Sequence, residues 1–365
     1  MFTLFSTRPI RNEKDLFGKG HREAVRKLNK AVEEGDFAAI LGPRRVGKTS
    51  VINVFLNKYG SKYKYLYYDL AFGMGREAIS YTELVPVMSN ISKEDLDYSA
   101  TLSLGIVRMD IRPKKAVEFQ NAFLNLLRFL NKRGEKVVII FDEAQVLPRF
   151  APLNMLGMLQ TISDGFENVT VVLSGSMPGL LERIVNPSED KPFFARYVEK
   201  IHVSRWKLEE SVEYLKRGLA KIGYTEDELV EAATELSNVP GFLAYYGRLR
   251  VNGEPHDKAL LATIEYAVKL WKLDVRNFIR IYKSPAYVVA LKKVAKGPSF
   301  GVTTEEILAE VTSLTGISER RAKSVLRNLV DGGLLIKPKR GIYQIPEKPL
   351  RKAILELQDR DVYNI

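Results

Sequence analysis

The residues best suited to chemistry form a glycine-rich stretch near the N-terminus. The phosphate-binding pattern G-x-x-x-x-G-K-[ST] is matched at every fixed position by Gly42-Pro43-Arg44-Arg45-Val46-Gly47-Lys48-Thr49. In such a loop the glycines leave backbone N–H groups free to surround an anion, and the lysine brings a positive charge to the β- and γ-phosphates. The Thr49 hydroxyl is suited to binding Mg²⁺. The pattern therefore predicts a site for a nucleoside triphosphate and Mg²⁺.

A chance match to this pattern is the alternative, and the flanking sequence argues against it. The uncharged run Phe37–Leu41 before the loop is typical of a strand that is buried on both faces of a parallel sheet. After the loop, Ser50–Tyr59 has a helical pattern, and the N-terminus of a helix favours an anion. Strand, loop and helix in this order are the context that the pattern requires. The residues that we expect to contact the nucleotide are Gly42, Pro43, Arg44, Arg45, Val46, Gly47, Lys48, Thr49 and Ser50.

Two adjacent carboxylates, Asp142 and Glu143, end a second apolar run that begins at Val137. Carboxylates at the carboxyl end of a parallel strand lie where ligands bind in open α/β sheets. We expect Asp142 to hold Mg²⁺, directly or through water, and Glu143 to polarise the attacking water. A helix start is the alternative for the pair taken alone. The phosphate-binding loop upstream favours the catalytic interpretation.

Polar residues near the ends of two further strands are candidates for contacts with the phosphates. Asn168–Leu173 predicts a strand, and Ser174 or Ser176 after it could touch the γ-phosphate or the water. An ordinary Gly-Pro turn is the alternative there. Arg196 lies just ahead of a fifth predicted strand, Val198–Val203, where a cation can neutralise charge on the leaving phosphates. A solvated arginine is the alternative.

These residues need a sheet and helices to bring them together. Short runs rich in β-branched and aromatic residues predict five strands, at Phe37–Leu41, Tyr63–Asp69, Lys136–Phe141, Asn168–Leu173 and Val198–Val203. Apolar residues at three- and four-residue spacing predict helices within Asp15–Glu34, Ser50–Tyr59 and Ala116–Arg133. The turn Leu16–Glu23 fits either the start of the first helix or a wall around the base and ribose of the nucleotide. Between residues 73 and 115 we assign nothing, since Thr101–Met109 fits either a hairpin or an irregular insertion. The sequence therefore predicts an α/β core over residues 1–204.

Beyond residue 204 the pattern is helical. The predicted helices are Lys207–Ile222, Glu226–Ser237, Phe242–Arg250 and Ala259–Phe278, and Asn238-Val239-Pro240-Gly241 is the break between the second and the third. We expect residues 205–283 to form a helical lid that packs over the nucleotide and moves with its occupant.

Residues 284–365 indicate a third unit. The predicted elements are helices at Ala286–Ala295, Ile307–Val311 and Ser318–Asp331, a hairpin of Leu334–Lys337 and Ile342–Ile345, and a closing helix at Pro349–Gln358. Three helices and a hairpin are the order of a winged helix, in which the third helix enters the major groove of DNA. The basic residues placed to contact duplex DNA are Arg320, Arg321, Lys323, Arg327, Lys339 and Arg340. Winged helices also serve as contacts for other proteins, so a protein partner is the alternative.

Composition excludes several classes of site. The chain has 365 residues, 45% of them hydrophobic and 27% charged, as in soluble globular proteins. It has no cysteine, which excludes disulfides, thiolate zinc sites and cysteine nucleophiles, and its three histidines lack metal-ligand spacing. No apolar stretch reaches the ~18 residues needed to span a bilayer, and the N-terminus lacks a secretory signal, so we expect a cytoplasmic protein without membrane contact. The net charge of +12 permits a nucleic-acid partner without specifying one.

With both nucleotide motifs present, the chain resembles the archaeal ATPase family. This family belongs to the AAA+/STAND branch of P-loop ATPases and looks like a relative of the origin-recognition ATPases. The resemblance covers nearly the whole chain. The residues that carry it are Leu16-Phe17-Gly18-Lys19-Gly20, GPRRVGKTS at 42–50 and VVIIFDEAQ at 137–145. It implies a parallel sheet in 5-1-4-3-2 order, a helical lid and a C-terminal winged helix. It also implies adenine as the base, Glu143 as the residue that activates water, and Arg248 or Arg250 as a lid arginine.

The sequence thus predicts a Mg²⁺-dependent ATPase that binds ATP and ADP and works as a nucleotide-controlled switch, with Glu143, Lys48 and Arg196 in catalysis. We expect slow hydrolysis without a partner, because an arginine from a partner is the usual accelerant. The alternative is a DNA-binding initiator or regulator in which the nucleotide is mainly structural. A GTPase is disfavoured because N-K-x-D does not occur in the chain. A kinase is disfavoured because Asp142 and Glu143 suit water better than a substrate hydroxyl.

Overall fold

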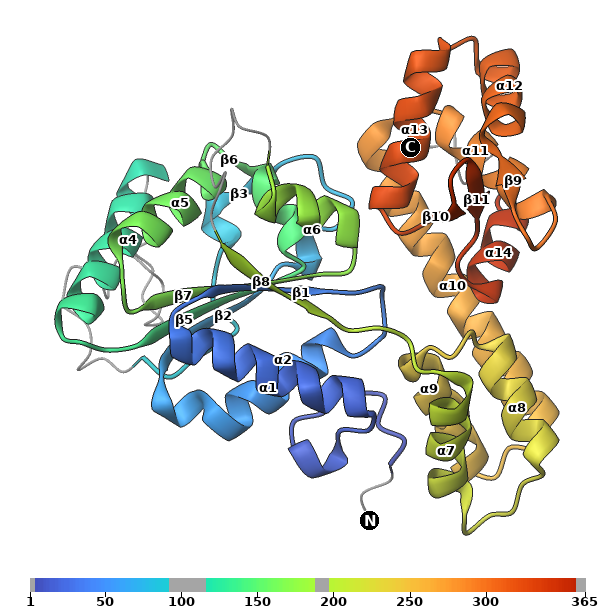
Figure 1. Ribbon diagram of the computed structural model, residues 1–365, viewed down its shortest axis with the longest axis horizontal. Coiled ribbons are helices and arrows are strands. Elements are labelled where there is room, and N and C mark those ends of the chain that lie inside the picture. The colour runs from blue at the N-terminus through green and yellow to red at the C-terminus, as the bar shows by residue number, and fades with distance from the viewer. Residues whose placement is uncertain (1–3, 92–115, 188–196, 359–365) are drawn as a thin grey trace.

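The computed structural model describes residues 4–91, 116–187 and 197–358. A six-stranded sheet forms the centre of the N-terminal part (Figure 1). Its strands lie in the order β4-β2-β5-β7-β1-β8, and all neighbours are parallel except β4, which is antiparallel to β2. The strands are β1 Phe37–Leu41, β2 Lys64–Asp69, β4 Met88–Ser89, β5 Val137–Asp142, β7 Val169–Gly175 and β8 Val198–His202. With the five predicted strands numbered in chain order, the sheet reads 5-1-4-3-2, and β4 adds a short strand at one edge.

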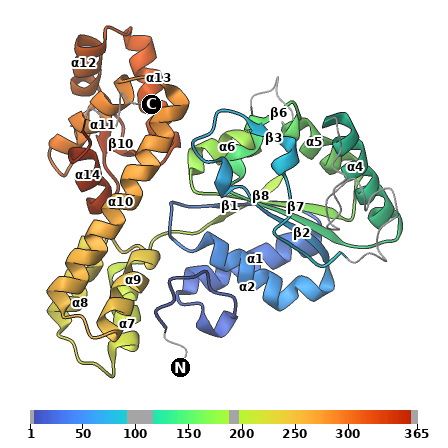
Figure 2. The same ribbon diagram turned by 180° about the vertical axis from the view of Figure 1, so that it is seen from behind.

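Helices cover both faces of this sheet (Figures 1 and 2). One face carries α1 Lys19–Glu34 and α2 Lys48–Tyr59, and the other carries α4 Ala116–Lys132, α5 Met155–Gly165 and α6 Pro178–Val185. In β1, Ala38 and Ile40 pack with the α1 and α2 residues, whereas Ala39 and Leu41 pack with those of α4, α5 and α6. Both faces of the strand are therefore apolar, which explains its uncharged sequence.

Smaller elements fill the connections. Strand β3 pairs in parallel with β6 to form a separate two-stranded sheet, and five short 3₁₀ helices are present in the described residues. The bounds are β3 Ile79–Ser80, β6 Phe150–Ala151, and 3₁₀ helices at Glu13–Asp15, Gly60–Lys62, Ala71–Gly73, Tyr81–Glu83 and Ala144–Arg149. The two interpretations of Thr101–Met109 concern residues outside the described part.

Four helices follow β8, at α7 Leu208–Leu219, α8 Glu226–Glu235, α9 Pro240–Val251 and α10 His256–Tyr282. Helix α9 begins two residues earlier than predicted, because Pro240 occupies its first turn, where proline costs no hydrogen bond. Helix α10 has 27 residues and runs from the other three helices into the C-terminal part (Figure 1).

The C-terminal part has helices α11 Ala286–Lys296, α12 Thr304–Thr315, α13 Glu319–Asp331 and α14 Lys348–Leu355, and strands β9 Val302–Thr303, β10 Ile336–Lys339 and β11 Ile342–Gln344. The three strands form a sheet in the order β10-β11-β9. A capping box between Thr303 and Glu306 starts α12. The first hairpin strand begins at Ile336 rather than Leu334, because the N–H groups of Leu334 and Leu335 both donate to the Leu329 carbonyl of α13.

One hydrophobic cluster joins α7–α10 to the C-terminal elements. Trp271, Val275 and Phe278 of α10 belong to the same buried cluster as Leu326 of α13 and Leu350 of α14. The boundary predicted between residues 283 and 284 therefore does not divide two separate cores in the described chain. No helix of the described residues is long and apolar enough to cross a membrane.

Candidate active site

The phosphate-binding loop lies between the end of β1 and the start of α2. Gly42 packs so closely against the Val203 carbonyl that a Cβ would overlap it, and Gly47 has φ +105°, which glycine adopts readily. Lys48 is buried, and its Nζ donates to the carbonyl oxygens of Gly42 at 2.9 Å and of Pro43 at 2.7 Å. The loop thus closes around its own lysine. Burial lowers the pKa of Lys48, and the negative charges of Glu143 and Asp142 oppose this effect.

Parallel pairing brings the predicted carboxylates to this loop. Thr49 Oγ1 donates to Asp142 Oδ2 at 2.8 Å, and the Tyr67 hydroxyl donates to the same oxygen at 3.2 Å. Burial raises the pKa of Asp142, the charge of Glu143 adds to this effect, and the hydrogen bond from Thr49 opposes it. The structure therefore places the two predicted Mg²⁺ ligands, Thr49 and Asp142, in direct contact.

The chemistry of this pair fits Mg²⁺ bound with a nucleotide. In the described part of the chain no cluster of three or more His, Cys, Asp or Glu side chains could hold a metal ion. One carboxylate and one hydroxyl are the usual protein share of a site in which phosphate oxygens and waters supply the other ligands. Asp142 and Thr49 would hold the ion, and its charge would neutralise the β- and γ-phosphate oxygens.

Glu143 follows Asp142 in a left-handed backbone conformation, with φ +56°. Its Oε2 accepts from Ser176 Oγ at 2.6 Å, from Ser176 N at 3.3 Å and from Gln145 Nε2 at 2.5 Å. Burial acts to raise the pKa of Glu143, but the charges of Lys48 and Arg44 and these hydrogen bonds hold it below its ordinary value. Glu143 is therefore an ionised carboxylate held in one orientation.

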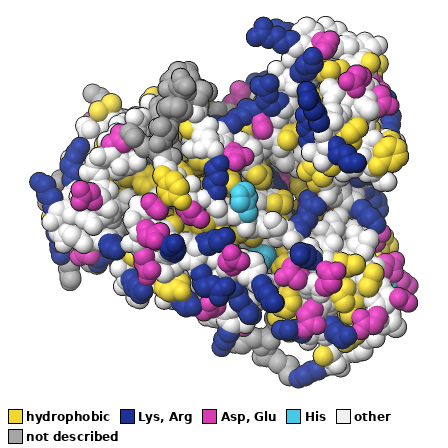
Figure 3. Space-filling view, viewed as in Figure 1, with side chains coloured by type: hydrophobic (Ala, Val, Ile, Leu, Met, Phe, Trp, Pro, Cys, Tyr) yellow, Lys and Arg dark blue, Asp and Glu magenta, His cyan; other side chains and the backbone are white. Residues whose placement is uncertain are grey.

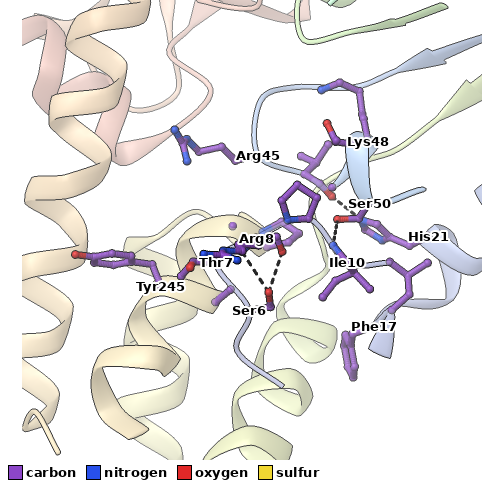
Figure 4. A pocket seen from close by; sticks show the side chains of 18 of the residues that line it. Ser6, Thr7, Arg8, Ile10, Phe17, His21, Arg45, Lys48, Ser50 and Tyr245 are labelled. Atoms are coloured by element: carbon purple, nitrogen blue, oxygen red, sulfur yellow. Dashed lines mark hydrogen bonds between the residues drawn. The ribbon is translucent and has the colours of Figure 1, made fainter. Parts of the chain in front are cut away.

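A cavity of about 400 Å³ lies next to the loop (Figure 4). One wall is the N-terminal segment, residues 4–10, where Ile10 N donates to Ser50 Oγ at 3.0 Å. A second wall is aromatic and comprises Phe17, Trp206 and Tyr214, with ring centroids 4.6 to 5.2 Å apart. Planar apolar rings beside a phosphate site can hold a nucleobase.

The third wall comes from α9 and α10, which hold the two loop arginines. Arg44 forms an ion pair with Asp274 of α10. The Arg45 guanidinium lies 5.7 Å from the ring centroid of Phe242 and 5.6 Å from that of Tyr266, which are cation–π distances. Gly241 N also donates to the Arg45 carbonyl at 3.0 Å. Both arginines therefore face the helical part.

The other predicted residues divide into three groups. Ser176 contacts Glu143, whereas Ser174 is fully buried at the end of β7. Arg196 lies outside the described residues. Arg248 and Arg250 do not line the cavity, and Arg250 instead pairs with Glu228 of α8. The basic residues of the C-terminal part, Arg320, Arg321, Lys323, Arg327, Lys339 and Arg340, are all exposed. Figure 3 shows Lys and Arg side chains on the surface of this part of the molecule.

Sequence reasoning missed three parts of the site, namely the N-terminal segment, Asp274, and Trp206, which contacts His21. His21 Nε2 lies 2.5 Å from the Val46 carbonyl oxygen, and Trp206 Nε1 donates to His21 Nδ1 at 3.3 Å. These residues belong to no short motif, and their contacts join positions far apart in the chain. For His21 the sequence left two interpretations open, a helix start or a wall around the base and ribose, and His21 lines the cavity together with Leu16 and Phe17.

Comparison with known proteins agrees with this geometry. Residues 21–234 match the family described as ATPase domain predominantly from Archaea. No curated protein matches the chain. Among solved structures, a Walker-type ATPase of Pyrococcus abyssi is 24% identical with a TM-score of 0.75, over 96% of this chain and 99% of that one. The ORC2 protein of Aeropyrum pernix, solved in ADPNP–ADP complexes, is 16% identical with a TM-score of 0.59, over 99% and 97% of the two chains. At these identities the similarity shows the fold alone.

Proposed function

The chain belongs to the family of ATPase domains found predominantly in Archaea, and from this premise we propose that it is a Mg²⁺-dependent ATPase working as a nucleotide-controlled switch. The observation that carries the proposal is the hydrogen bond between Thr49, at the end of the phosphate-binding loop, and Asp142, which the ionised Glu143 follows in the chain. A metal-ligand pair and a carboxylate base beside a phosphate cradle are the parts that hydrolysis of a triphosphate requires.

Each side chain has a role in this mechanism. Lys48 exchanges its two carbonyl partners for the β- and γ-phosphates, which are stronger acceptors because they are charged. Thr49 and Asp142 hold Mg²⁺. Glu143 accepts a proton from the water that attacks the γ-phosphate. The hydrogen bonds that Ser176 and Gln145 donate to the Glu143 carboxylate hold it in place.

Two substitutions test the proposal. Lys48→Ala should abolish ATP binding, because it removes the only lysine in the cavity lining of the described chain. Glu143→Gln should retain ATP binding but stop phosphate release, because an amide cannot accept the proton. Calorimetric titration and a phosphate-release assay measure the two effects. The exposed Glu254→Gln is the matched control. Hydrolysis by Glu143→Gln at the parent rate would show that the catalytic assignment is wrong.

We expect hydrolysis by the isolated chain to be slow. An arginine from a partner usually supplies the charge that accelerates phosphoryl transfer. Three arginines line the cavity in the described residues, and without a nucleotide Arg44 pairs with Asp274 and Arg45 contacts Phe242 and Tyr266, while Arg8 lies in the N-terminal segment. Arg196, which lies outside those residues, keeps its proposed role as a further cation near the phosphates. A protein or DNA partner that raises the rate of phosphate release would support this expectation.

Binding of duplex DNA is the second candidate function, with the nucleotide in a mainly structural role. The supporting observation is that the six basic residues of α13 and of the β10–β11 hairpin are all exposed. Helix α13 has the place of the recognition helix in a winged helix, and the hairpin has the place of the wing. Affinity for duplex DNA that falls steeply with salt would support this function. Affinity that is absent or does not change with salt would leave a protein contact as the role of residues 284–365.

A further inference from the structure

The ion pair between Arg44 and Asp274 lies inside the nucleotide cavity, and it joins the phosphate-binding loop to α10. Both residues line the cavity, and their side chains are only 20% and 12% exposed. Arg44 is the third residue of the loop motif, and Asp274 lies about two turns before the end of α10. A shielded pair at this place holds the loop and the helix together more firmly than an exposed pair would.

Arg44 has binding capacity that Asp274 does not use. Its Nη2 is buried without a hydrogen-bond partner in the described part of the chain. A buried donor without a partner costs free energy, and a guanidinium can bind two oxygens of an anion in its planar fork. Lys48 and Glu143 line the same cavity. The unused donor of Arg44 is therefore available to a second anion in the phosphate site.

Asp274 is poorly placed to share the cavity with such an anion. Burial raises its pKa, and the charges of Arg44 and Arg45 oppose this effect, while Glu143 adds to it. A phosphate in the cavity would repel the Asp274 carboxylate and would compete with it for Arg44. The two anions therefore compete for Arg44, and the more highly charged phosphate is the stronger competitor.

We propose that Arg44 binds the γ-phosphate of ATP, and that Asp274 is a positioning residue which holds Arg44 when the γ-phosphate is absent. This inference rests on the proposed function, since it requires a nucleotide on the loop. In the described chain no arginine of α7–α10 lines the cavity, and the arginines that do are Arg8 of the N-terminal segment and Arg44 and Arg45 of the loop.

The same pair connects the nucleotide with the C-terminal part. One turn before Asp274, Trp271 Nε1 donates to Glu347 Oε2 at 2.9 Å, and Glu347 precedes α14. Glu347 also pairs with Arg205, which follows β8, at 3.1 Å. Helix α10 thus contacts the loop through Asp274 and the C-terminal part through Trp271, one turn apart. Transfer of Arg44 to the γ-phosphate removes the loop's ion pair to this helix, and that change distinguishes the two states of the switch.

The test measures dissociation constants of ADP and of a non-hydrolysable ATP analogue, both with Mg²⁺, for the full chain. Asp274→Asn should tighten binding of the analogue relative to ADP by about tenfold, because the competing carboxylate is gone. Arg44→Ala should weaken binding of the analogue relative to ADP by about tenfold, because it loses a charged hydrogen bond to the γ-phosphate. Asp257→Asn, exposed on the first turn of α10, is the matched control and should leave the ratio unchanged.

A double variant separates a positioning role from a structural one. If Asp274 acts through Arg44, then Asp274→Asn should have no further effect on the ratio in the Arg44→Ala background. If Asp274→Asn does not fold, Asp274→Ser takes its place in both backgrounds. If Asp274→Asn and Arg44→Ala still bind both nucleotides and the ratio of the two dissociation constants equals that of the parent, this inference is wrong and the proposed ATPase function stands. Failure of the parent protein to bind either nucleotide would instead overturn the proposed function.

Discussion

At the scale of single residues, His21 is held in one tautomer by partners from two different regions. The indole N–H of Trp206 donates to Nδ1, so the ring proton must be on Nε2, which donates to the Val46 carbonyl of the phosphate-binding loop. Burial lowers the pKa of His21 from 6.5, while the hydrogen bond to Val46 and the charge of Glu210 oppose this effect. His21 is therefore neutral in the folded protein at neutral pH.

We expect His21 to weaken the fold at acidic pH. The unfolded chain protonates His21 below about pH 6.5, whereas the folded chain protonates it only at lower pH. The unfolded state then binds more protons, so the free energy of unfolding falls as the pH falls below about 6.5, with a slope of at most ~1.4 kcal/mol per pH unit.

Urea denaturation of the parent protein and of His21→Gln between pH 5 and pH 7.5 measures this contribution. The difference in free energy of unfolding between the two proteins should shrink as the pH falls, because the variant has no imidazole to protonate. The exposed His202→Gln is the control and should leave the pH profile unchanged. A difference that stays constant over this range would contradict the prediction.

At the scale of elements, the N-terminal segment is fixed by one aromatic side chain. Phe5 is 1% exposed and packs edge-to-face against Tyr214. It also packs against Gly218 of α7 and Gly247 of α9, where a Cβ at either glycine would overlap the Phe5 ring. The two glycines thus make room for Phe5, which holds residues 4–10 against the nucleotide cavity.

Phe5→Ala should therefore destabilise the protein by about 3–5 kcal/mol, the usual cost of removing a buried phenylalanine ring. It should also weaken nucleotide binding, because residues 4–10 form a wall of the cavity. Thermal denaturation and calorimetric titration measure the two effects. Phe300→Ala, at a side chain that is 75% exposed, is the control and should change neither. Stability and affinity equal to those of the parent would show that the segment is not held by Phe5.

At the scale of the whole molecule, the shared hydrophobic core decides how the C-terminal part can be tested. Removal of residues 284–365 would expose the face of α10 that carries Trp271 and Phe278, because both belong to the cluster that these residues complete. Loss of DNA binding in a truncated chain would then report damage to the core as well as loss of a DNA contact. Substitution of exposed residues in the full chain avoids this.

The full chain with Arg320→Glu and Arg321→Glu should bind duplex DNA more weakly than the parent, with a shallower dependence on salt, because each lost phosphate contact reduces the slope by about one. Both residues are exposed on α13, so ATP binding should stay unchanged. Lys258→Glu, exposed on α10, is the control. Equal affinity and equal salt slopes for the double variant and the parent would show that α13 does not contact DNA.

The local features of the site could be predicted from the sequence. The loop at 42–49 is a continuous segment between a strand and a helix, so its shape depends on its own glycines and on the flanking apolar pattern. Asp142 and Glu143 could be placed beside it because parallel strands present their carboxyl ends at one edge of a sheet. Residues 73–115 carry no clear periodicity, and they gave no comparable prediction.

The sequence by itself therefore determined the α/β elements, the phosphate-binding loop and the paired carboxylates. The tertiary structure alone decided the rest of the cavity, because His21 meets Trp206 across 185 residues and Arg44 meets Asp274 across 230. Only the tertiary structure shows that residues of α10 line the cavity and also pack in the core of the C-terminal part. Propensity and periodicity act over a few residues, whereas contacts between distant segments depend on how the whole chain packs.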